Sequence, residues 1–149
     1  MIDGVVIVPL RRIADERGTV SHMLRASAPH FRGFGEIYFS SIHPGAVKGW
    51  HRHDPAFLNY ACIAGSIKLV LYDERPGSRT HGELMELFLG IDDHKLVQVP
   101  PQVWNGFKAV GTSTALVANC CTHEHGTFQS ERLDPFVNHI PYDWTLRSQ

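Results

Sequence analysis

The chain has 149 residues, the size of one ordinary domain, and such a domain buries roughly 70% of the surface that its unfolded chain would expose. Its 14 Lys and Arg against 15 Asp and Glu give a formal charge of −1, which excludes a strong basic excess for binding a nucleic-acid backbone or an anionic membrane. An apolar fraction of 43% and a charged fraction of 19% exclude a disordered chain. We therefore expect one domain over residues 1–149, with neither nucleic acid nor membrane as a partner.

The N-terminal segment and the cysteines indicate the cellular compartment of the protein. Residues 1–12 carry an acidic residue where a signal peptide would be basic, and their apolar stretch is too short to span a membrane. Cys120 and Cys121 are adjacent and the total of three is odd, which does not fit a disulfide framework. These features predict a cytoplasmic protein with reduced cysteines.

Short β-type runs recur along the chain, separated by turn residues such as Pro44-Gly45 and Pro100-Pro101. The run 66–72 alternates most clearly, with Ile67, Leu69 and Leu71 on one face, and predicts a half-buried strand. The pattern predicts an all-β fold, an antiparallel barrel or double sheet that hides its edges. The predicted strands cover 5–8, 19–24, 36–42, 59–64, 66–72, 84–89, 95–99 and 115–121.

Two of the ten histidines, His51 and His53, are spaced to form a site. In an extended strand they project to the same face, about 7 Å apart. Together with Gly45, which precedes them, they resemble the first half of the cupin metal motif, but Phe57 and Leu58 stand where its Glu would be, and Asn105 where its third His would be. Two imidazoles make a poor site for a divalent metal, so we expect no metal and no cofactor.

Without a metal, a histidine that lines a barrel is a candidate proton-transfer group, because its ordinary pKa near 6.5 lets it act as a base at neutral pH. A structural role, with the ring bonded to backbone groups in the core, is the alternative for His51. A metal site that recruits the cluster His123-Glu124-His125 is a further alternative, against the simpler interpretation of that cluster as a solvated loop.

Five segments, in order, resemble motifs of the dTDP-4-dehydrorhamnose 3,5-epimerase family, metal-free cupins that act on nucleotide-linked 4-keto-6-deoxy sugars. Residues 15–18 resemble its D-x-R-G, 48–51 its R-G-x-H and 73–78 its D-x-R-x-x-S. Residues 100–107 resemble its P-x-G-x-x-H-G-F, and 133–135 the Asp-Pro near its C-terminus. The resemblance implies a cupin-type antiparallel jelly-roll barrel, a nucleotide-diphosphate sugar as substrate, and a homodimer, often with exchanged N-terminal strands.

The resemblance also implies roles for particular residues. His51 matches the general base and Asp134 the carboxylate that orients it, and an Asp so placed would fix the tautomer and stabilise the imidazolium. Arg17 matches a nucleotide-diphosphate contact, and Lys48 stands where the family has Arg, which keeps the cation but loses the bidentate geometry. Arg75 is either a substrate contact or a structural ion-pair residue. Trp104, beside Asn105, either lines the pocket or packs in the core.

The departures from the family pattern point to a narrower activity. The Tyr that donates a proton on the opposite sugar face falls at Ala118 or Asn119, and the Lys that helps to hold the enolate falls at Leu58 or Asn59. Inversion at both C3 and C5 needs a donor at each centre, so the loss favours inversion at C3 alone. Tyr60, Tyr72, His53 or a water could replace the donor.

The main hypothesis is an epimerase in which His51 removes a proton alpha to the C4 ketone, with Lys48, His53 and Asn105 as candidates to stabilise the enolate. A nucleotide-sugar 3,4-ketoisomerase is the alternative, because His53 fits that cupin family better. A metal-dependent cupin oxygenase and a non-catalytic sugar-binding cupin are alternatives from other classes.

Overall fold

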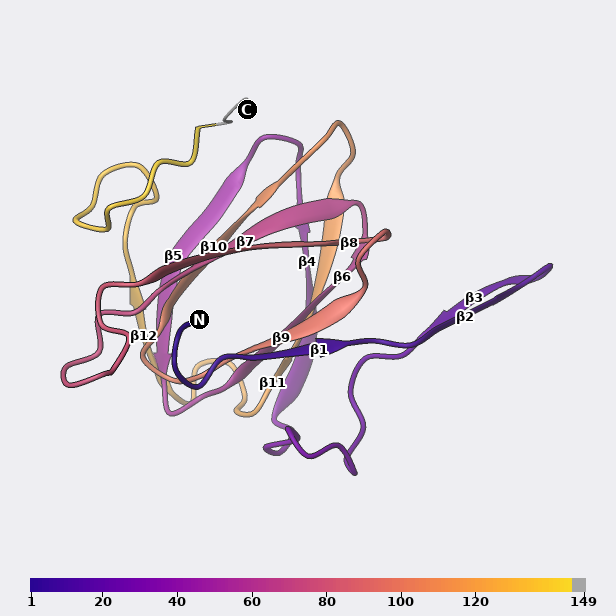
Figure 1. The fold of residues 1–149 in the computed structure, drawn as a ribbon, viewed down its shortest axis with the longest axis horizontal. Coiled ribbons are helices and arrows are strands. Elements are labelled where there is room, and N and C mark those ends of the chain that lie inside the picture. Colours follow the sequence, from indigo (N-terminus) through magenta and orange to yellow (C-terminus); the bar gives the residue numbers. More distant parts are fainter. Residues whose placement is uncertain (146–149) are drawn as a thin grey trace.

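The structure, a computed structural model, describes residues 1–145 and consists of strands and connecting loops (Figure 1). Two five-stranded sheets have the orders β1-β9-β6-β11-β4 and β12-β5-β10-β7-β8, and β2 pairs with β3 in a separate hairpin. Every pairing in both sheets is antiparallel. The strands are β1 (Val6–Pro9), β2 (Arg12–Asp15), β3 (Gly18–Ser21), β4 (Glu36–Ile42), β5 (Val47–Asp54), β6 (Leu58–Ala64), β7 (Ser66–Tyr72), β8 (Leu84–Gly90), β9 (Lys95–Val99), β10 (Trp104–Ala109), β11 (Ala115–Cys121) and β12 (Gln129–Arg132).

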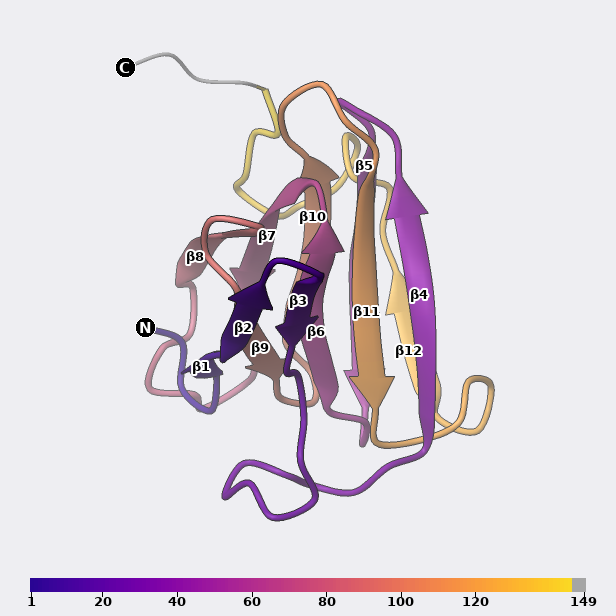
Figure 2. The same cartoon turned by 90° about the vertical axis from the view of Figure 1, so that its right-hand side faces the viewer.

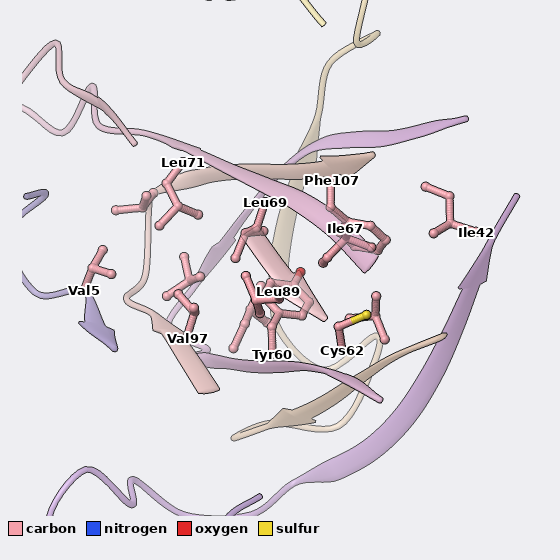
Figure 3. Close-up of a cluster of buried hydrophobic side chains, with 14 of the residues drawn as sticks. Val5, Ile42, Tyr60, Cys62, Ile67, Leu69, Leu71, Leu89, Val97 and Phe107 are labelled. Carbon is pink, nitrogen blue, oxygen red and sulfur yellow. The ribbon is translucent and has the colours of Figure 1, made fainter. Parts of the chain in front are cut away.

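The two sheets face each other and enclose the main core, which confirms the predicted all-β jelly-roll barrel (Figure 2). Alternate residues point inward, as the period of two in a strand requires. Figure 3 shows Leu69 of β7 and Tyr60 of β6 entering the same interior from the two sheets. Ile2 and Val5, from the N-terminal segment, are buried in the same cluster.

A second buried cluster covers the outer face of β5, β7 and β10. It contains Trp50, Val70 and Trp104, covered by Ile140 and Trp144 from the C-terminal segment. Strand β7 is therefore buried on both faces, and the prediction that it would be half buried is wrong. The cause is the C-terminal segment, which the alternation within 66–72 does not reveal.

The β2–β3 hairpin projects away from the barrel (Figure 1). All eight of its strand residues are exposed, although Ile13 and Val20 are large and apolar. No helix able to span a membrane occurs in residues 1–145.

Candidate active site

A cavity of about 700 Å³ opens between the two sheets, within the size range of small-molecule sites. One wall comes from β5, β10 and β12, and the other from β4, β6 and β11. It is lined by Glu36, Tyr38, Ser40, Lys48, His51, His53, Tyr60, Phe107, Val117, Asn119, His125, Gly126, Phe128, Ser130 and Arg132. Five predicted site residues thus meet in one cavity, namely Lys48, His51, His53, Tyr60 and Asn119.

His51 and His53 stand side by side on β5, as their spacing predicts, but their surroundings differ. The two rings are nearly parallel, with centroids 6.3 Å apart. The His53 Nδ1 lies 2.8 Å from the Ser130 hydroxyl oxygen, and the Phe128 ring packs perpendicular to the His53 ring. The His51 ring has no hydrogen-bond partner among residues 1–145, so its nitrogens are available to a ligand in the cavity.

Burial keeps both imidazoles neutral at pH 7. Burial, followed by the positive charge of Arg132, lowers the pKa of His51 below its usual 6.5. Burial also lowers the pKa of His53, to about 4, with further contributions from His51, Arg132 and His125. A neutral imidazole has a free lone pair, so His51 can accept a proton.

Hydrogen bonds link Asn105 and Tyr60 to the backbone of β5 at His51. The Asn105 side-chain amide donates to the backbone carbonyl of His51 at 3.0 Å, and its Oδ1 accepts from the Tyr60 hydroxyl at 2.8 Å. Both residues are buried. Asn105 therefore fixes the position of His51 through the backbone, and its amide is not free to contact an enolate.

Tyr38 and Asn119 face the histidines from the opposite wall. They lie directly across from each other on β4 and β11, and the Asn119 Nδ2 donates to the Tyr38 hydroxyl at 2.9 Å. The Asn119 Oδ1 accepts from the backbone N–H of Asn59 at 3.1 Å. The Asn59 side chain is bonded to Gln98 and to the carbonyl of Cys120. Asn59, expected to contact substrate as a position where the family's enolate-holding Lys falls, therefore does not line the cavity.

Of the cationic side chains in residues 1–145, Lys48 and Arg132 line the cavity; Lys48 was predicted and Arg132 was not. The Lys48 ammonium donates to the Ser40 hydroxyl at 2.7 Å and to the Ser41 carbonyl at 2.6 Å, which links β5 to β4 at the cavity wall. Arg132, the register partner of His51 on β12, lines the cavity and was not predicted.

Asp134 does not form the predicted pair with His51. Its exposed carboxylate accepts from the backbone N–H groups of Phe136 and Val137, at 2.8 and 3.0 Å. This is the usual use of Asp at a turn, where the side chain satisfies amides that the following residues leave unpaired.

Arg75 and Trp104 also lie outside the cavity. The Arg75 guanidinium donates to the fully buried carboxylate of Asp73, at 2.9 Å, which matches the structural alternative for this residue. The Trp104 indole belongs to the outer cluster and donates to Glu74 at 2.8 Å.

Arg17 lies in the turn of the projecting hairpin, where it pairs with Asp15. It does not line the cavity of its own chain.

The cluster at 123–125 is divided between two environments. His125 lines the cavity, and its backbone N–H donates to Glu36. The His123 Nδ1 instead lies 2.9 Å from the hydroxyl of Thr122. Within residues 1–145, no three His, Cys, Asp or Glu side chains are grouped to hold a metal ion.

Comparison with known proteins gives concordant results. A family model described as dTDP-4-dehydrorhamnose 3,5-epimerase matches residues 1–148. The chain is 32% identical over 144 residues to the probable low-salt glycan biosynthesis epimerase Agl13 of Haloferax volcanii, covering 95% of this chain and 89% of that protein. It is 29% identical over 143 residues to the spore coat polysaccharide biosynthesis protein SpsL of Bacillus subtilis, covering 96% and 91%.

A solved structure extends the likeness to the fold over 96% of this chain. The crystal structure of a dTDP sugar isomerase from Desulfovibrio desulfuricans G20 superimposes with a TM-score of 0.93 at 44% sequence identity. The superposition covers 96% of this chain and 92% of the other.

Proposed function

Because this chain belongs to the dTDP-4-dehydrorhamnose 3,5-epimerase family and is a sugar-nucleotide epimerase, we propose that it inverts C3 of a nucleoside-diphosphate-linked 4-keto-6-deoxyhexose. The observation that carries this proposal is the His51 imidazole, which lines the cavity without a hydrogen-bond partner among residues 1–145. A general base needs this combination of access to substrate and a free lone pair.

The reaction begins when His51 removes the C3 proton, which is acidic because the neighbouring C4 carbonyl accepts the electron pair. The products of this step are an imidazolium and an enolate whose charge lies largely on the C4 oxygen. The Lys48 ammonium, held by Ser40 and Ser41, supplies a fixed positive charge in the same cavity. One preorganised donor of this kind contributes about 3–4 kcal/mol to stabilising such a charge.

The position of the family's proton-donating Tyr supports restriction to one centre. It falls at Ala118 or Asn119 in this chain, and neither a methyl group nor an amide is an acid of comparable strength. A second inversion, at C5, would need a further donor placed for that carbon. We therefore assign inversion to C3 alone.

The substrate's diphosphate is expected to meet Arg132, because Lys48 is assigned to the enolate. Arg132 offers a planar guanidinium suited to phosphate oxygens. A thermal-shift series with TDP, CDP and GDP tests which nucleotide is bound, because a ligand that binds only the folded state raises the melting temperature.

Solvent exchange tests the proposed reaction. In D₂O, NMR of a nucleotide 4-keto-6-deoxyhexose with the wild-type enzyme should show deuterium entering C3, and His51→Asn should abolish this exchange while nucleotide affinity persists. His81→Asn is the matched control, because His81 is exposed and lies outside the cavity. Absence of C3 exchange in the wild type would end the proposal, and exchange at C5 would overturn the restriction to C3.

One observation favours a second candidate, a 3,4-ketoisomerase. His51 and His53 line the cavity together, and two such imidazoles could shuttle protons between C3 and C4. The low pKa of His53, about 4, argues against it as a base. Product analysis separates the two reactions, because isomerisation moves the carbonyl to C3 and epimerisation leaves it at C4.

We further propose that the enzyme is a homodimer formed through the β2–β3 hairpin. In a single chain the side chains of Ile13 and Val20 on this hairpin are 43% and 61% exposed. An interface with a second copy would bury this apolar surface. It also carries Arg17 away from its own cavity, so Arg17 can meet a substrate only if the hairpin of one copy reaches the cavity of another.

A further inference from the structure

Inversion at a carbon needs two groups on opposite faces of the sugar, one to remove a proton and another to return one. We propose that Tyr38 is the proton donor that faces His51 across the cavity. This inference rests on the proposed function and extends it, because the sequence leaves the donor unidentified. Three observations support it: the position of Tyr38 opposite His51, the free proton of its hydroxyl, and the hydrogen bonds or positions that exclude the other candidate tyrosines.

Tyr38 and His51 belong to opposite walls. Strands β4 and β5 belong to different sheets (Figure 2). Tyr38 on β4 and His51 on β5 both line the cavity. The cavity of about 700 Å³ between the two walls leaves room for a sugar ring. A ring bound there presents one face to His51 and the other to Tyr38.

The hydrogen bond from Asn119 prepares the Tyr38 hydroxyl to donate. Because the Asn119 Oδ1 already accepts from the backbone N–H of Asn59, its Nδ2 must be the atom that faces Tyr38. The Tyr38 oxygen therefore acts as an acceptor in this bond and keeps its own proton. No acceptor among residues 1–145 takes that proton, which leaves it for a group in the cavity.

The other two candidate tyrosines, Tyr60 and Tyr72, are not available as proton donors. The Tyr60 hydroxyl donates its proton to Asn105, and Asn105 in turn holds the backbone of His51. Tyr72 packs against the outer cluster and does not line the cavity.

Two other polar groups on β4, Ser40 and Glu36, are less suited to this role. The Ser40 hydroxyl, which accepts from Lys48, is an alcohol and a far weaker acid than a phenol. A carboxylate oxygen of Glu36 accepts from the backbone N–H of His125. Burial raises the pKa of Tyr38, with a smaller opposing effect from the Asn119 hydrogen bond, so the phenol stays protonated at neutral pH.

The proton balance of the step is complete. The C3–H bond breaks and its proton goes to His51, while the bonding electrons form the enolate. The Tyr38 O–H bond then breaks, a new C3–H bond forms on the opposite face, and the C4 carbonyl is restored. The phenolate regains a proton from solvent and the imidazolium releases one, so the hydrogen on the inverted carbon does not come from the substrate.

Tyr38→Phe separates the two half-reactions. His51 can still remove the C3 proton and return a solvent deuteron to the same face, so exchange with retention should continue within about threefold of the wild-type rate. Inversion should fall by about 10²-fold or more, the usual contribution of a positioned acid. NMR in D₂O measures exchange and inversion in the same sample, and Tyr72→Phe, outside the cavity, should leave both rates unchanged.

Asn119→Ala provides a second, independent variant. It removes the amide that orients the Tyr38 hydroxyl, and inversion should fall relative to exchange, by less than in Tyr38→Phe. The ratio is measured on protein shown by thermal melting to be folded, and nucleotide affinity should be unchanged in the Tyr38 variant.

Three results would overturn the assignment of Tyr38. They are inversion retained in Tyr38→Phe, an equal loss of exchange and inversion in that variant while nucleotide binding is intact, and selective loss of inversion in Tyr60→Phe instead. Absence of C3 exchange in the wild type is a different result, because it contradicts the proposed reaction itself.

Discussion

The two histidines of β5 show how neighbouring groups give different properties to identical side chains two residues apart. Ser130 binds the ring of His53, whereas the ring of His51 meets no such partner among residues 1–145. Arg132, which lies across from His51 in register, disfavours protonation of both rings. His51 is therefore the available base, and its working pH range depends on Arg132.

The pH dependence of the reaction should report this arrangement. The base is active when neutral, so kcat/KM should rise with pH through the pKa of His51, with a midpoint below 6.5. Arg132→Gln removes a positive charge that disfavours the imidazolium, so the pKa of His51 should rise and the midpoint should move toward 6.5. A pH–rate profile of both proteins measures the shift.

Arg79→Gln is the control for this profile, because Arg79 pairs with Asp3 at the surface and does not line the cavity. Its midpoint should equal that of the wild type. A midpoint for Arg132→Gln that stays in place or moves to lower pH would show that the base is not the imidazole beside Arg132.

At the scale of elements, the runs predicted from the sequence are rich in apolar residues, and three of the four strands without a predicted run are polar. The ranges of β4, β7, β9 and β11 agree with the predicted runs residue for residue. No run was predicted for β2, β5, β10 or β12, which contain RIAD, VKGWHRHD, WNGFKA and QSER. Part of the reason is function, since the inward side chains of β5 and β12 face a cavity and need not be apolar.

The same limit explains which site residues could be predicted. His51, His53 and Lys48 lie in one local motif, so one segment of sequence was enough to find them. Tyr38 and Arg132 become visible only when β4 is placed beside β11, and β12 beside β5. A pairing between strands about 80 residues apart cannot be inferred from local alternation.

The hairpin allows a prediction about assembly. Replacing Ile13 and Val20 by Asp puts charge on the exposed apolar pair and should convert a dimer to monomers, because a charge buried without a partner in an interface is costly. Analytical ultracentrifugation measures the change. The folded barrel should persist, since neither residue belongs to its core.

Thr19→Asp is the matched control in the same hairpin, because Thr19 is exposed and already polar. It should remain a dimer at the concentrations where the double variant dissociates. A wild-type protein that sediments as a monomer would refute the assembly, and a double variant that stays dimeric would place the interface elsewhere.

At the scale of the whole molecule, the sheet β12-β5-β10-β7-β8 separates the cavity on its inner face from a buried aromatic cluster on its outer face. Its inner face carries His51 and His53 toward the cavity, and its outer face carries Trp50 and Trp104 into the aromatic cluster under the C-terminal segment. The C-terminal segment therefore covers β5 on the side opposite the cavity. The folded barrel keeps His51 and His53 partly buried and neutral, and the effect of this burial on the free energy of unfolding depends on pH.

The stability of the fold should consequently fall as the pH is lowered through the range in which unfolded histidine becomes charged. In the unfolded chain His53 takes up a proton near pH 6.5, but in the folded state its pKa is about 4, so the unfolded state binds more protons between these values. Acidification from pH 7 to 5 should lower the free energy of unfolding by about 1–2 kcal/mol, after allowance for solvent screening. Urea unfolding across this range measures the decline.

His53→Asn should flatten the decline, because it removes the group whose pKa differs most between the two states among the histidines of residues 1–145. The window above pH 5 isolates this effect, since carboxylates with ordinary or lowered pKa values stay ionised there. His81→Asn, at an exposed site, should keep the wild-type slope. A wild-type stability that is constant or rises on acidification would mean that His53 is already protonated in the folded protein, and the cavity wall would then carry a positive charge beside His51.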